Sequence, residues 1–354
     1  MILCPARFEP IFSPRPWGSL SLAPFFPEKS NLADPIGEAW MTGDECRFAS
    51  GPFEGQLVRD AWLKLPSDWI GTSADRTRPF PILVKFIFTE QKLSVQVHPG
   101  DEYAAQHEKS SGGRGKTEMW YAMRARPGAE VMVGLRSGAT KDKFRRAIGD
   151  GTAEDWLEHV PLKTGEAVFV PAGTVHTIGP GLVLCEIQEQ SDITYRVYDY
   201  NRRDAHAKSR ELHIDKALDV IRFDRQRGGK IEPLQIDRDG LAEIYFAACP
   251  FFATMKWEFS GRITADTSSE HFDLLVFLDG DGSIRWRKER ADYAPMQVWM
   301  LPAALGPFEL VPSSRTTLLR TYVPDRLEEF AGRLADQGIS RDALSRLIHP
   351  RLNP

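Results

Sequence analysis

The sequence predicts a mainly β protein made of two β-barrels, with a small helical insertion and further helices at the C-terminus. Short runs of β-branched and aromatic residues, such as ILVKFIF at 82–88, recur along the chain between turns rich in glycine and proline. Two internal stretches, about 136–160 and 209–222, instead space their apolar residues as helices do. Strands therefore dominate, and helices interrupt them at defined places.

The elements follow one another in a definite order. Residues 1–60 are rich in proline and glycine, which favours irregular segments and short strands. In the first helical stretch, Thr140 and Thr152 are suitable N-caps for two short helices. Strands then resume, and the segment 209–222 predicts a further helix with an apolar stripe that begins at Leu212.

The chain divides into two strand-rich regions at a polar, charged stretch between residues 222 and 240. We expect an N-terminal domain at 1–230 and a second barrel at 231–324, in which the turn DGDG at 279–282 suits a β-hairpin. Residues 325–354 form a C-terminal extension with two short helices joined by a glycine. The extension either packs on the barrels or forms a subunit contact.

Composition excludes several classes of function. The 354 residues carry a formal net charge of −4, which argues against nucleic acid as a partner. No apolar run is long enough for a membrane helix, and the N-terminus lacks the pattern of a signal peptide, so we expect a cytoplasmic protein with no membrane partner. The four cysteines are far apart and form no CxxC pair, which indicates reduced thiols.

Two strand-like runs carry polar side chains suited to chemistry. In the run 93–98, Ser94, Gln96 and His98 alternate with apolar residues and therefore share one face of the strand. A polar, glycine-rich loop separates this run from a second one that begins at Glu118. One face of the first strand is built for packing, and the other offers ligands.

A third run has the spacing of a known metal-binding motif. In GEAVFVPAGTVHTI, Gly165, Pro171, Gly173 and His176 match G-x5-P-x-G-x2-H, the second motif of the cupin superfamily, in which a Pro-Gly turn presents a histidine to a metal. The plainer alternative is a hydrogen-bonded strand histidine. The upstream cluster of polar residues favours the ligand interpretation.

Gln96, His98, Glu118 and His176 together would offer one amide oxygen, two imidazole nitrogens and one carboxylate. This set suits zinc, also admits Mn, Fe, Co or Ni, and leaves a position open for water or substrate. The usual cupin pattern places the glutamate a few residues after an HxH, whereas Glu118 follows much later and Gln96 replaces the first histidine. Spacing alone therefore leaves open that Glu118 faces solvent.

A resemblance to a known family covers residues 10–323. It is carried by RPWGS, IGEAW, LSVQVHPGDEYA, GKTEMWY, VPAGTVHTIG, ITYRVYDYNR and LHIDKALDVI, in this order. These motifs resemble the type I mannose-6-phosphate isomerase (phosphomannose isomerase) family in its shorter bacterial form. The resemblance implies two cupin barrels around a small helical part, with a catalytic first barrel and a second barrel without metal.

The resemblance also implies the site. It places one zinc ion per chain on Gln96, His98, Glu118 and His176, with Arg196 in the strand after the last ligand. Ser94 and Lys116 match a serine and a lysine that the family uses, and both could hold the substrate phosphate.

The implied activity is a metal-dependent aldose-ketose isomerisation that interconverts mannose 6-phosphate and fructose 6-phosphate through a cis-enediol(ate). In such a reaction, Arg196 would steady the developing negative charge. A metal-bound hydroxide, His98 and Lys116 are all candidates for the proton carrier.

Other interpretations and the assembly remain open at this point. The rival interpretation is a non-catalytic cupin that senses or binds sugar phosphates, although the complete set of ligands with Arg196 and Lys116 favours an enzyme. An iron cupin oxygenase is disfavoured because the usual HxH is QxH here. The expected partner is a sugar-phosphate substrate, and the chain would be a monomer or a homodimer.

Overall fold

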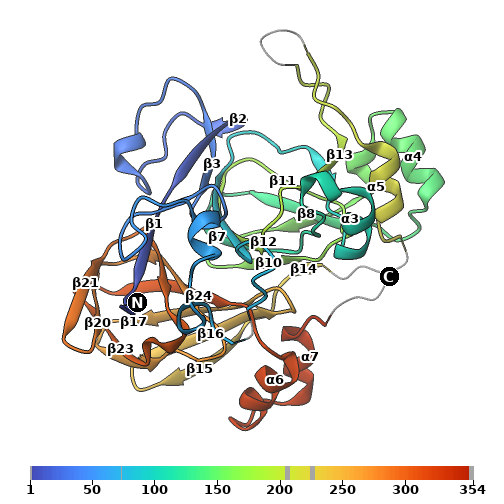
Figure 1. Ribbon diagram of the computed structural model, residues 1–354. Coiled ribbons are helices and arrows are strands. Elements are labelled where there is room, and N and C mark those ends of the chain that lie inside the picture. The colour runs from blue at the N-terminus through green and yellow to red at the C-terminus, as the bar shows by residue number, and fades with distance from the viewer. Residues whose placement is uncertain (1, 73, 204–207, 224–227, 351–354) are drawn as a thin grey trace.

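The computed structural model describes residues 2–72, 74–203, 208–223 and 228–350. The mainly β prediction is confirmed, with four sheets and a few helices (Figure 1). The sheets are open and packed in pairs, and they do not close into the barrels that we expected. No helix in the described part is long and apolar enough to cross a membrane.

The N-terminal half is built from two sheets. The seven-stranded sheet has the order β14 (Gly229–Lys230), β10 (Ala167–Val170), β7 (Glu118–Ala125), β12 (Leu182–Glu189), β5 (Ile82–Phe88), β3 (Ile36–Trp40) and β2 (Ile11–Ser19). The five-stranded sheet has the order β13 (Tyr195–Tyr198), β6 (Val95–Val97), β11 (His176–Ile178), β8 (Glu130–Leu135) and β9 (Leu157–Pro161).

The C-terminal half also has two sheets. The eight-stranded sheet has the order β15 (Leu234–Arg238), β16 (Leu241–Ala248), β17 (Ala253–Phe259), β24 (Thr316–Tyr322), β19 (Asp273–Asp279), β22 (Val298–Leu301), β1 (Ala6–Glu9) and β4 (Arg47–Phe48). The four-stranded sheet has the order β18 (Ile263–Asp266), β23 (Pro307–Pro312), β20 (Gly282–Trp286) and β21 (Glu289–Tyr293). Because β1 and β4 belong to the eight-stranded sheet, the N-terminal residues cross the division that we expected at residue 230.

Short helices connect and cover the sheets. The α-helices are α1 (Val58–Trp62), α2 (Ser67–Ile70), α3 (Asp101–His107), α4 (Lys141–Gly149), α5 (Ile214–Val220), α6 (Leu327–Ala335) and α7 (Arg341–Leu347). The 3₁₀ turns are Pro27–Lys29, Lys109–Ser111, Ala153–Trp156 and Ala303–Leu305.

The strand alternation divides the N-terminal half into layers. Along β5, Val84 and Phe86 face a core shared with the C-terminal half, whereas Ile87 belongs to a second core between the seven- and five-stranded sheets. A third core lies on the far side of the five-stranded sheet, where Phe144 of α4 and Leu218 of α5 are buried. The space between the two sheets of this half is therefore enclosed on both sides.

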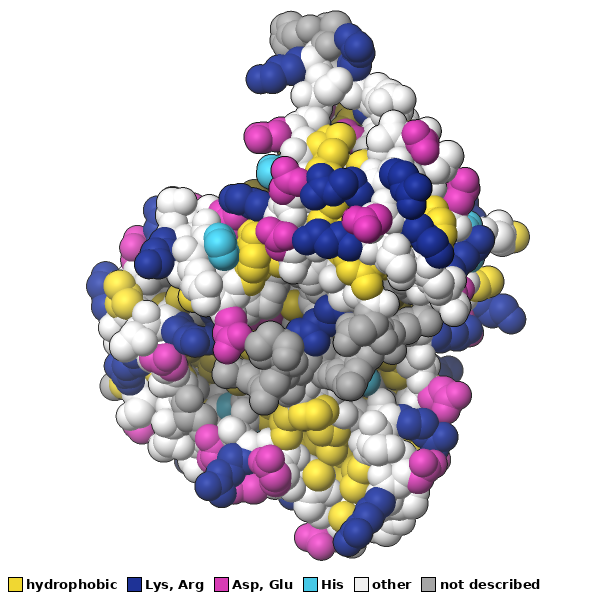
Figure 2. Space-filling model, turned by 90° about the vertical axis from the view of Figure 1, so that its right-hand side faces the viewer, with side chains coloured by type: hydrophobic (Ala, Val, Ile, Leu, Met, Phe, Trp, Pro, Cys, Tyr) yellow, Lys and Arg dark blue, Asp and Glu magenta, His cyan; other side chains and the backbone are white. Residues whose placement is uncertain are grey.

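The outer surface over α4 and α5 is a solvated, mixed-charge face. Figure 2 shows basic and acidic side chains intermixed on this side. Lys141 pairs with Asp219 at 2.9 Å, and Arg145 pairs with Asp215 at 2.7 Å. Such exposed pairs contribute little to stability, typically ~0–1 kcal/mol each.

Two helix predictions need correction. Thr140 is the N-cap of α4, and its hydroxyl accepts a hydrogen bond from the amide of Lys143, as predicted. The second half of the 136–160 stretch is instead a 3₁₀ turn followed by β9, because its backbone pairs with β8. The predicted helix at 209–222 is shortened to α5, since His213 bonds to the backbone of strand β13 and Leu212 remains 40% exposed.

The predicted DGDG hairpin is also wrong. β19, before the turn, pairs with β22 and β24, whereas β20, after it, pairs with β21 and β23. The turn therefore carries the chain from one sheet to the other. Gly280 has a φ of +83°, and a Cβ there would lie 2.4 Å from the carbonyl oxygen of Arg315, so the crossing requires glycine at this position.

The C-terminal extension packs on the molecule. Helices α6 and α7 flank Gly338, which has a φ of +86°, and they bury Phe330 and Leu347 in the core of the C-terminal half. Beyond α7, the amide of His349 donates to the carbonyl of Ala248, and its ring stacks on Phe169 of β10 at 3.9 Å between centroids. The extension therefore contacts both halves.

Candidate active site

Three of the predicted residues lie in one row across the five-stranded sheet. Arg196 of β13 is the direct partner of Gln96 in β6, and Gln96 is the direct partner of His176 in β11. Directly opposed residues in an antiparallel sheet present their side chains together on the same face. Val95 and Val97 point the other way into the core under the helices, so Gln96 faces the opposite sheet.

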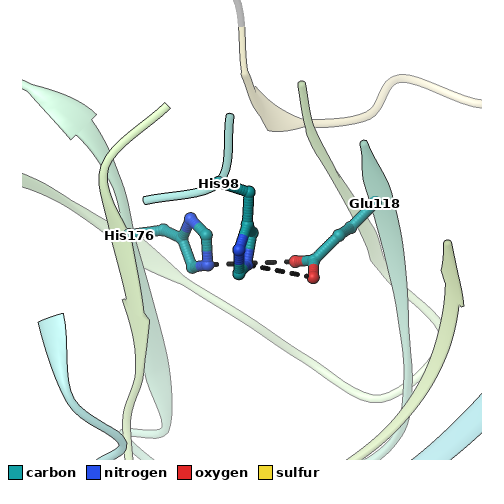
Figure 3. A group of neighbouring side chains, drawn as sticks. All are labelled: His98, Glu118 and His176. Atoms are coloured by element: carbon teal, nitrogen blue, oxygen red, sulfur yellow. Dashed lines mark ion pairs between the residues drawn. The ribbon is translucent and has the colours of Figure 1, made fainter. Parts of the chain in front are cut away.

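The opposite sheet supplies the carboxylate. Glu118, the first residue of β7, lies 3.3 Å from Nε2 of His98 through Oε1 and 3.8 Å from Nε2 of His176 through Oε2. All three side chains are at most 1% exposed. Figure 3 shows the two imidazoles and the carboxylate converging on a common centre. The expectation that these ligands meet agrees with this geometry, and the solvent-facing alternative for Glu118 does not.

Hydrogen bonds to backbone carbonyls determine the tautomer of both imidazoles. Nδ1 of His98 lies 2.8 Å from the carbonyl oxygen of Ile193, and Nδ1 of His176 lies 2.8 Å from that of Thr174. Because a carbonyl can only accept, each ring donates its Nδ1–H, and each Nε2 presents a lone pair to the centre. Two imidazole lone pairs and a carboxylate face one another in a dry interior, an arrangement that a cation between them would satisfy.

The protonation states of His98, His176 and Glu118 are those that metal ligands require. Burial lowers the pKa of His98 and lowers that of His176 to about 3, so both rings are neutral near pH 7. Burial alone would raise the pKa of Glu118, but the neighbouring Lys116 holds it well below its usual range. Neutral imidazoles and an ionised carboxylate are the protonation states that bind a divalent ion.

Gln96 and Ser94 complete the ligand side of the centre. The amide nitrogen of Gln96 lies 3.3 Å from Nε2 of His176, and its amide oxygen accepts a hydrogen bond from the hydroxyl of Ser94 at 3.4 Å. Rotating the amide by half a turn would point its oxygen at the centre. The fourth expected ligand is thus beside the other three.

Lys116 is deeply placed for a lysine. Its ammonium lies 2.8 Å from Oε1 of Glu118, and its side chain is 5% exposed. Burial would lower its pKa, but the charges of Glu118 and Glu186 raise it instead. Lys116 is therefore charged here and contacts an atom of the ligand set.

The guanidinium of Arg196 has one nitrogen that is hydrogen-bonded and another that is buried without a partner. Its Nη1 donates to the carbonyl of Glu211 at 3.0 Å, while its Nε is buried with no hydrogen-bond partner among the described residues. An unpartnered buried donor next to Gln96 can bind a negative oxygen of a ligand.

A second charged row, which no single run of the sequence indicates, lies on the seven-stranded sheet. Trp40, Lys85, Glu186 and Trp120 are direct cross-strand partners on neighbouring strands. The ammonium of Lys85 lies 4.5 Å from the ring of Trp40, 3.9 Å from Glu186 and 3.4 Å from Asp192. A lysine in the middle of the apolar run ILVKFIF was the available signal, since an unpaired lysine is rarely buried.

Glu186 is the titratable member of this row. Trp120 donates to it at 3.0 Å, and burial together with the charge of Glu118 raises its pKa to about 7. One other cluster among the described residues has the spacing to hold a metal ion: Glu270, Asp325 and Glu329. It contains no histidine and is largely exposed. Of the two clusters, the one formed by His98, Glu118 and His176 alone combines burial, imidazole and a neighbouring lysine.

Comparisons with known proteins agree with this geometry. Residues 7–125 match the family model for the phosphomannose isomerase type I catalytic domain. The chain is 33% identical over 311 residues to the mannose-6-phosphate isomerase ManA of Bacillus subtilis, covering 86% of this chain and 95% of that protein. It is 37% identical over 205 residues to a mannose-6-phosphate isomerase of Streptococcus mutans, covering 58% of this chain and 63% of that protein.

Solved structures show the same fold. The crystal structure of the mannose 6-phosphate isomerase from Bacillus subtilis superimposes with a TM-score of 0.81 at 28% identity, covering 90% of this chain and 99% of that one. A zinc-bound mannose 6-phosphate isomerase gives a TM-score of 0.70 at 17% identity, a likeness of fold. Identity over most of both chains, together with the convergent ligands, establishes that this chain belongs to the type I phosphomannose isomerase family.

Proposed function

We propose that the protein is a zinc-dependent isomerase that interconverts mannose 6-phosphate and fructose 6-phosphate. The observation that carries this proposal is the buried group of His98, Glu118 and His176 between two sheets, with Lys116 in contact with Glu118 and Arg196 opposite Gln96. We infer the reaction from family membership, and we infer the metal from the nitrogen and oxygen donors of the site.

The metal would be held by Gln96, His98, Glu118 and His176. These nitrogen and oxygen donors, without a thiolate, suit zinc and leave a position open. When bound, zinc supplies a Lewis acid that polarises the oxygens on the two reacting carbons. With its oxygen turned to the metal, the amide of Gln96 would present its nitrogen to Ser94 and donate to the Ser94 hydroxyl, which would orient the amide ligand.

We propose Lys116 as the group that moves the proton between C1 and C2. His98 and His176 are unsuited to this task, because each uses Nδ1–H on a backbone carbonyl and turns Nε2 to the metal centre. Lys116 is kept protonated here by the charge of Glu118. If Glu118 were a metal ligand, its charge would no longer hold the proton on Lys116, and burial would lower the pKa of Lys116 toward the range of a useful base.

Arg196 stabilises the negative charge that develops on the substrate oxygen. Its free Nε lies in the row of Gln96, and a guanidinium in a water-poor pocket stabilises such charge strongly. Binding without catalysis would not require a buried lysine and a buried, unpartnered arginine donor at the metal end. The arrangement therefore supports an enzyme over a sugar-phosphate sensor.

The residues of the site and the cysteines also bear on the assembly and the location of the protein. All the site residues come from one chain, so the site needs no second copy, and the enzyme works as a monomer or a homodimer. We place it in the cytoplasm, because Cys46, Cys185 and Cys249 are buried free thiols.

The test is a coupled assay with mannose 6-phosphate on the metal-replete protein, combined with elemental analysis. We expect a chelator to abolish turnover and zinc to restore it, and His176→Ala to lose both metal and turnover. His159→Ala is the matched control, because His159 is an exposed histidine paired with Glu130. Full turnover in metal-free protein would refute the proposal.

A further inference from the structure

Arg15 in strand β2 belongs to the polar network of the site, although it lies far from the ligands in sequence. Its Nη2 donates to Oε2 of Glu38 at 2.8 Å, and the same oxygen accepts a hydrogen bond from Nε1 of Trp40 at 2.8 Å. The ring of Trp40 in turn contacts the ammonium of Lys85. Two donors on one carboxylate oxygen fix Glu38, and Glu38 fixes the guanidinium of Arg15.

The backbone makes room for this arrangement. A Cβ at Gly37 would lie 2.5 Å from Cβ of Arg15 and 2.7 Å from the ring of Trp17. Any side chain at position 37 would therefore push Arg15 out of its place. Glycine here keeps the stem of Arg15 against β3 and its charged end beside Glu38.

Arg15 lies toward the outer end of this network. Its side chain is 32% exposed, compared with 5% for Lys116 and 3% for Lys85. Glu38, at 13%, is intermediate. Exposure thus rises from the buried metal ligands through Lys85 and Glu38 to Arg15, so Arg15 is the solvent-accessible cation of this network.

Arg15 also acts electrostatically on Asp192 and Arg196. Burial raises the pKa of Asp192, and the cations Lys85, Lys116 and Arg15 together lower it. Burial lowers the pKa of Arg196, and Arg15 is among the cations that lower it further. Arg15 of β2 therefore acts on β13, which carries Arg196, and on Asp192 in the segment before it.

A sugar 6-phosphate needs a cation that lies away from the metal end. Lys116 and Ser94, which the family resemblance suggested as phosphate-binding residues, contact Glu118 and Gln96 and therefore lie at the metal end. The phosphorus is separated from C2 by four carbon atoms and an ester oxygen, which directs the phosphate away from the metal end. Lys85 is shared between Asp192 and Glu186, whereas Arg15 pairs with one carboxylate among the described residues.

We propose that Arg15, positioned by Glu38, binds the phosphate group of the substrate. This inference rests on the proposed function for the identity of the sugar phosphate. A guanidinium that keeps donors available beside its carboxylate partner can bind phosphate oxygens with charge-assisted hydrogen bonds. Arg15 is then a substrate-binding residue that distinguishes phosphorylated from free sugars.

The test measures binding and turnover separately. Calorimetry with a hexitol 6-phosphate, which lacks the carbonyl needed for reaction, should show Arg15→Ala binding about ten- to hundredfold more weakly than wild type, with Arg15→Lys between them. The unphosphorylated hexitol should bind all three proteins equally. In turnover, kcat/KM for mannose 6-phosphate should fall by a similar factor. Arg126→Ala, which breaks the exposed pair with Glu90, is the control and should change neither quantity.

Each result decides a different question. Equal affinity of wild type and Arg15→Ala for the hexitol 6-phosphate overturns the role of Arg15, as does a wild type that binds no phosphorylated hexitol. A wild type that binds the hexitol 6-phosphate through Arg15 but turns over no mannose 6-phosphate overturns the proposed function and leaves phosphate binding by Arg15 standing.

Discussion

Replacing Lys116 by methionine should destabilise the metal-free protein far more than the zinc-bound protein. The ammonium of Lys116 lies 2.8 Å from a carboxylate that is 1% exposed. At an effective dielectric constant of about 20, unit charges at this separation attract by about 6 kcal/mol. Desolvation offsets part of this, and removing one partner of a buried ion pair typically costs ~3–5 kcal/mol. Without metal, the variant leaves Glu118 as a buried charge with no cation in contact.

Zinc should cancel most of that loss, because the bound ion takes over the charge of Glu118. A difference of ~3 kcal/mol between the metal-free and zinc-bound losses corresponds, by thermodynamic linkage, to about hundredfold tighter zinc binding by the variant. The variant would nevertheless be inactive, since it lacks the proposed proton carrier. Zinc would thus restore the stability of the variant without restoring its activity.

The measurement is urea unfolding at pH 8, with and without a chelator, together with a zinc titration. Lys92→Met is the matched control, because Lys92 pairs with Glu154 while its side chain is 41% exposed, and such a pair contributes ~1 kcal/mol or less. Equal losses with and without zinc, or unchanged zinc affinity, would refute the placement of Lys116 against a metal ligand.

Three further predictions concern other parts of the chain. Arg196→Ala should lower turnover by at least ~100-fold while unfolding stability changes by less than ~1 kcal/mol; losses of matching size in both assays would make the residue structural. Burial raises the pKa of Glu189 to about 8 from an ordinary value near 4.5, so the folded state retains a proton that the unfolded state releases, and stability falls as pH rises between these values. Glu189→Gln should therefore gain up to ~1.4 kcal/mol per pH unit relative to wild type between pH 6 and 8, and a pH-independent difference in urea unfolding would contradict this. Deleting residues 325–354 should cost more than ~3 kcal/mol in urea unfolding, because four side chains buried by α6 and α7 lose their packing; an unchanged midpoint would show that the extension does not support the fold.

Local patterns predicted the ligand strands well. Alternation placed Ser94, Gln96 and His98 on one face, and the Pro-Gly turn placed His176 on a strand, because these features depend on backbone geometry within a few residues. Convergence of Glu118 with them could be proposed only from the family resemblance. The reason is that Glu118 lies in the opposite sheet, and sheet packing is set by contacts remote in sequence.

The errors have the same physical origin. Residues 157–160 have helical spacing, but pairing with β8 gives their backbone a better set of hydrogen bonds than a short helix would. The DGDG turn satisfies local hairpin rules, although its flanking strands find partners in different sheets. The charged row around Lys85 and Arg15 was missed because it forms across strands, and no single run of residues contains it.

The C-terminal half contributes no metal ligand, but it supports the site through the core that the two halves share. Tyr121 of β7 packs on Phe246 at 5.5 Å, and Phe169 of β10 packs on Phe252 at 6.3 Å, so the strand that begins at Glu118 rests on the other half of the molecule. A laboratory evolution experiment selecting only for faster turnover should therefore recover substitutions around Phe246. Such variants would change the position of Glu118 indirectly, by altering the packing against the strand that carries it.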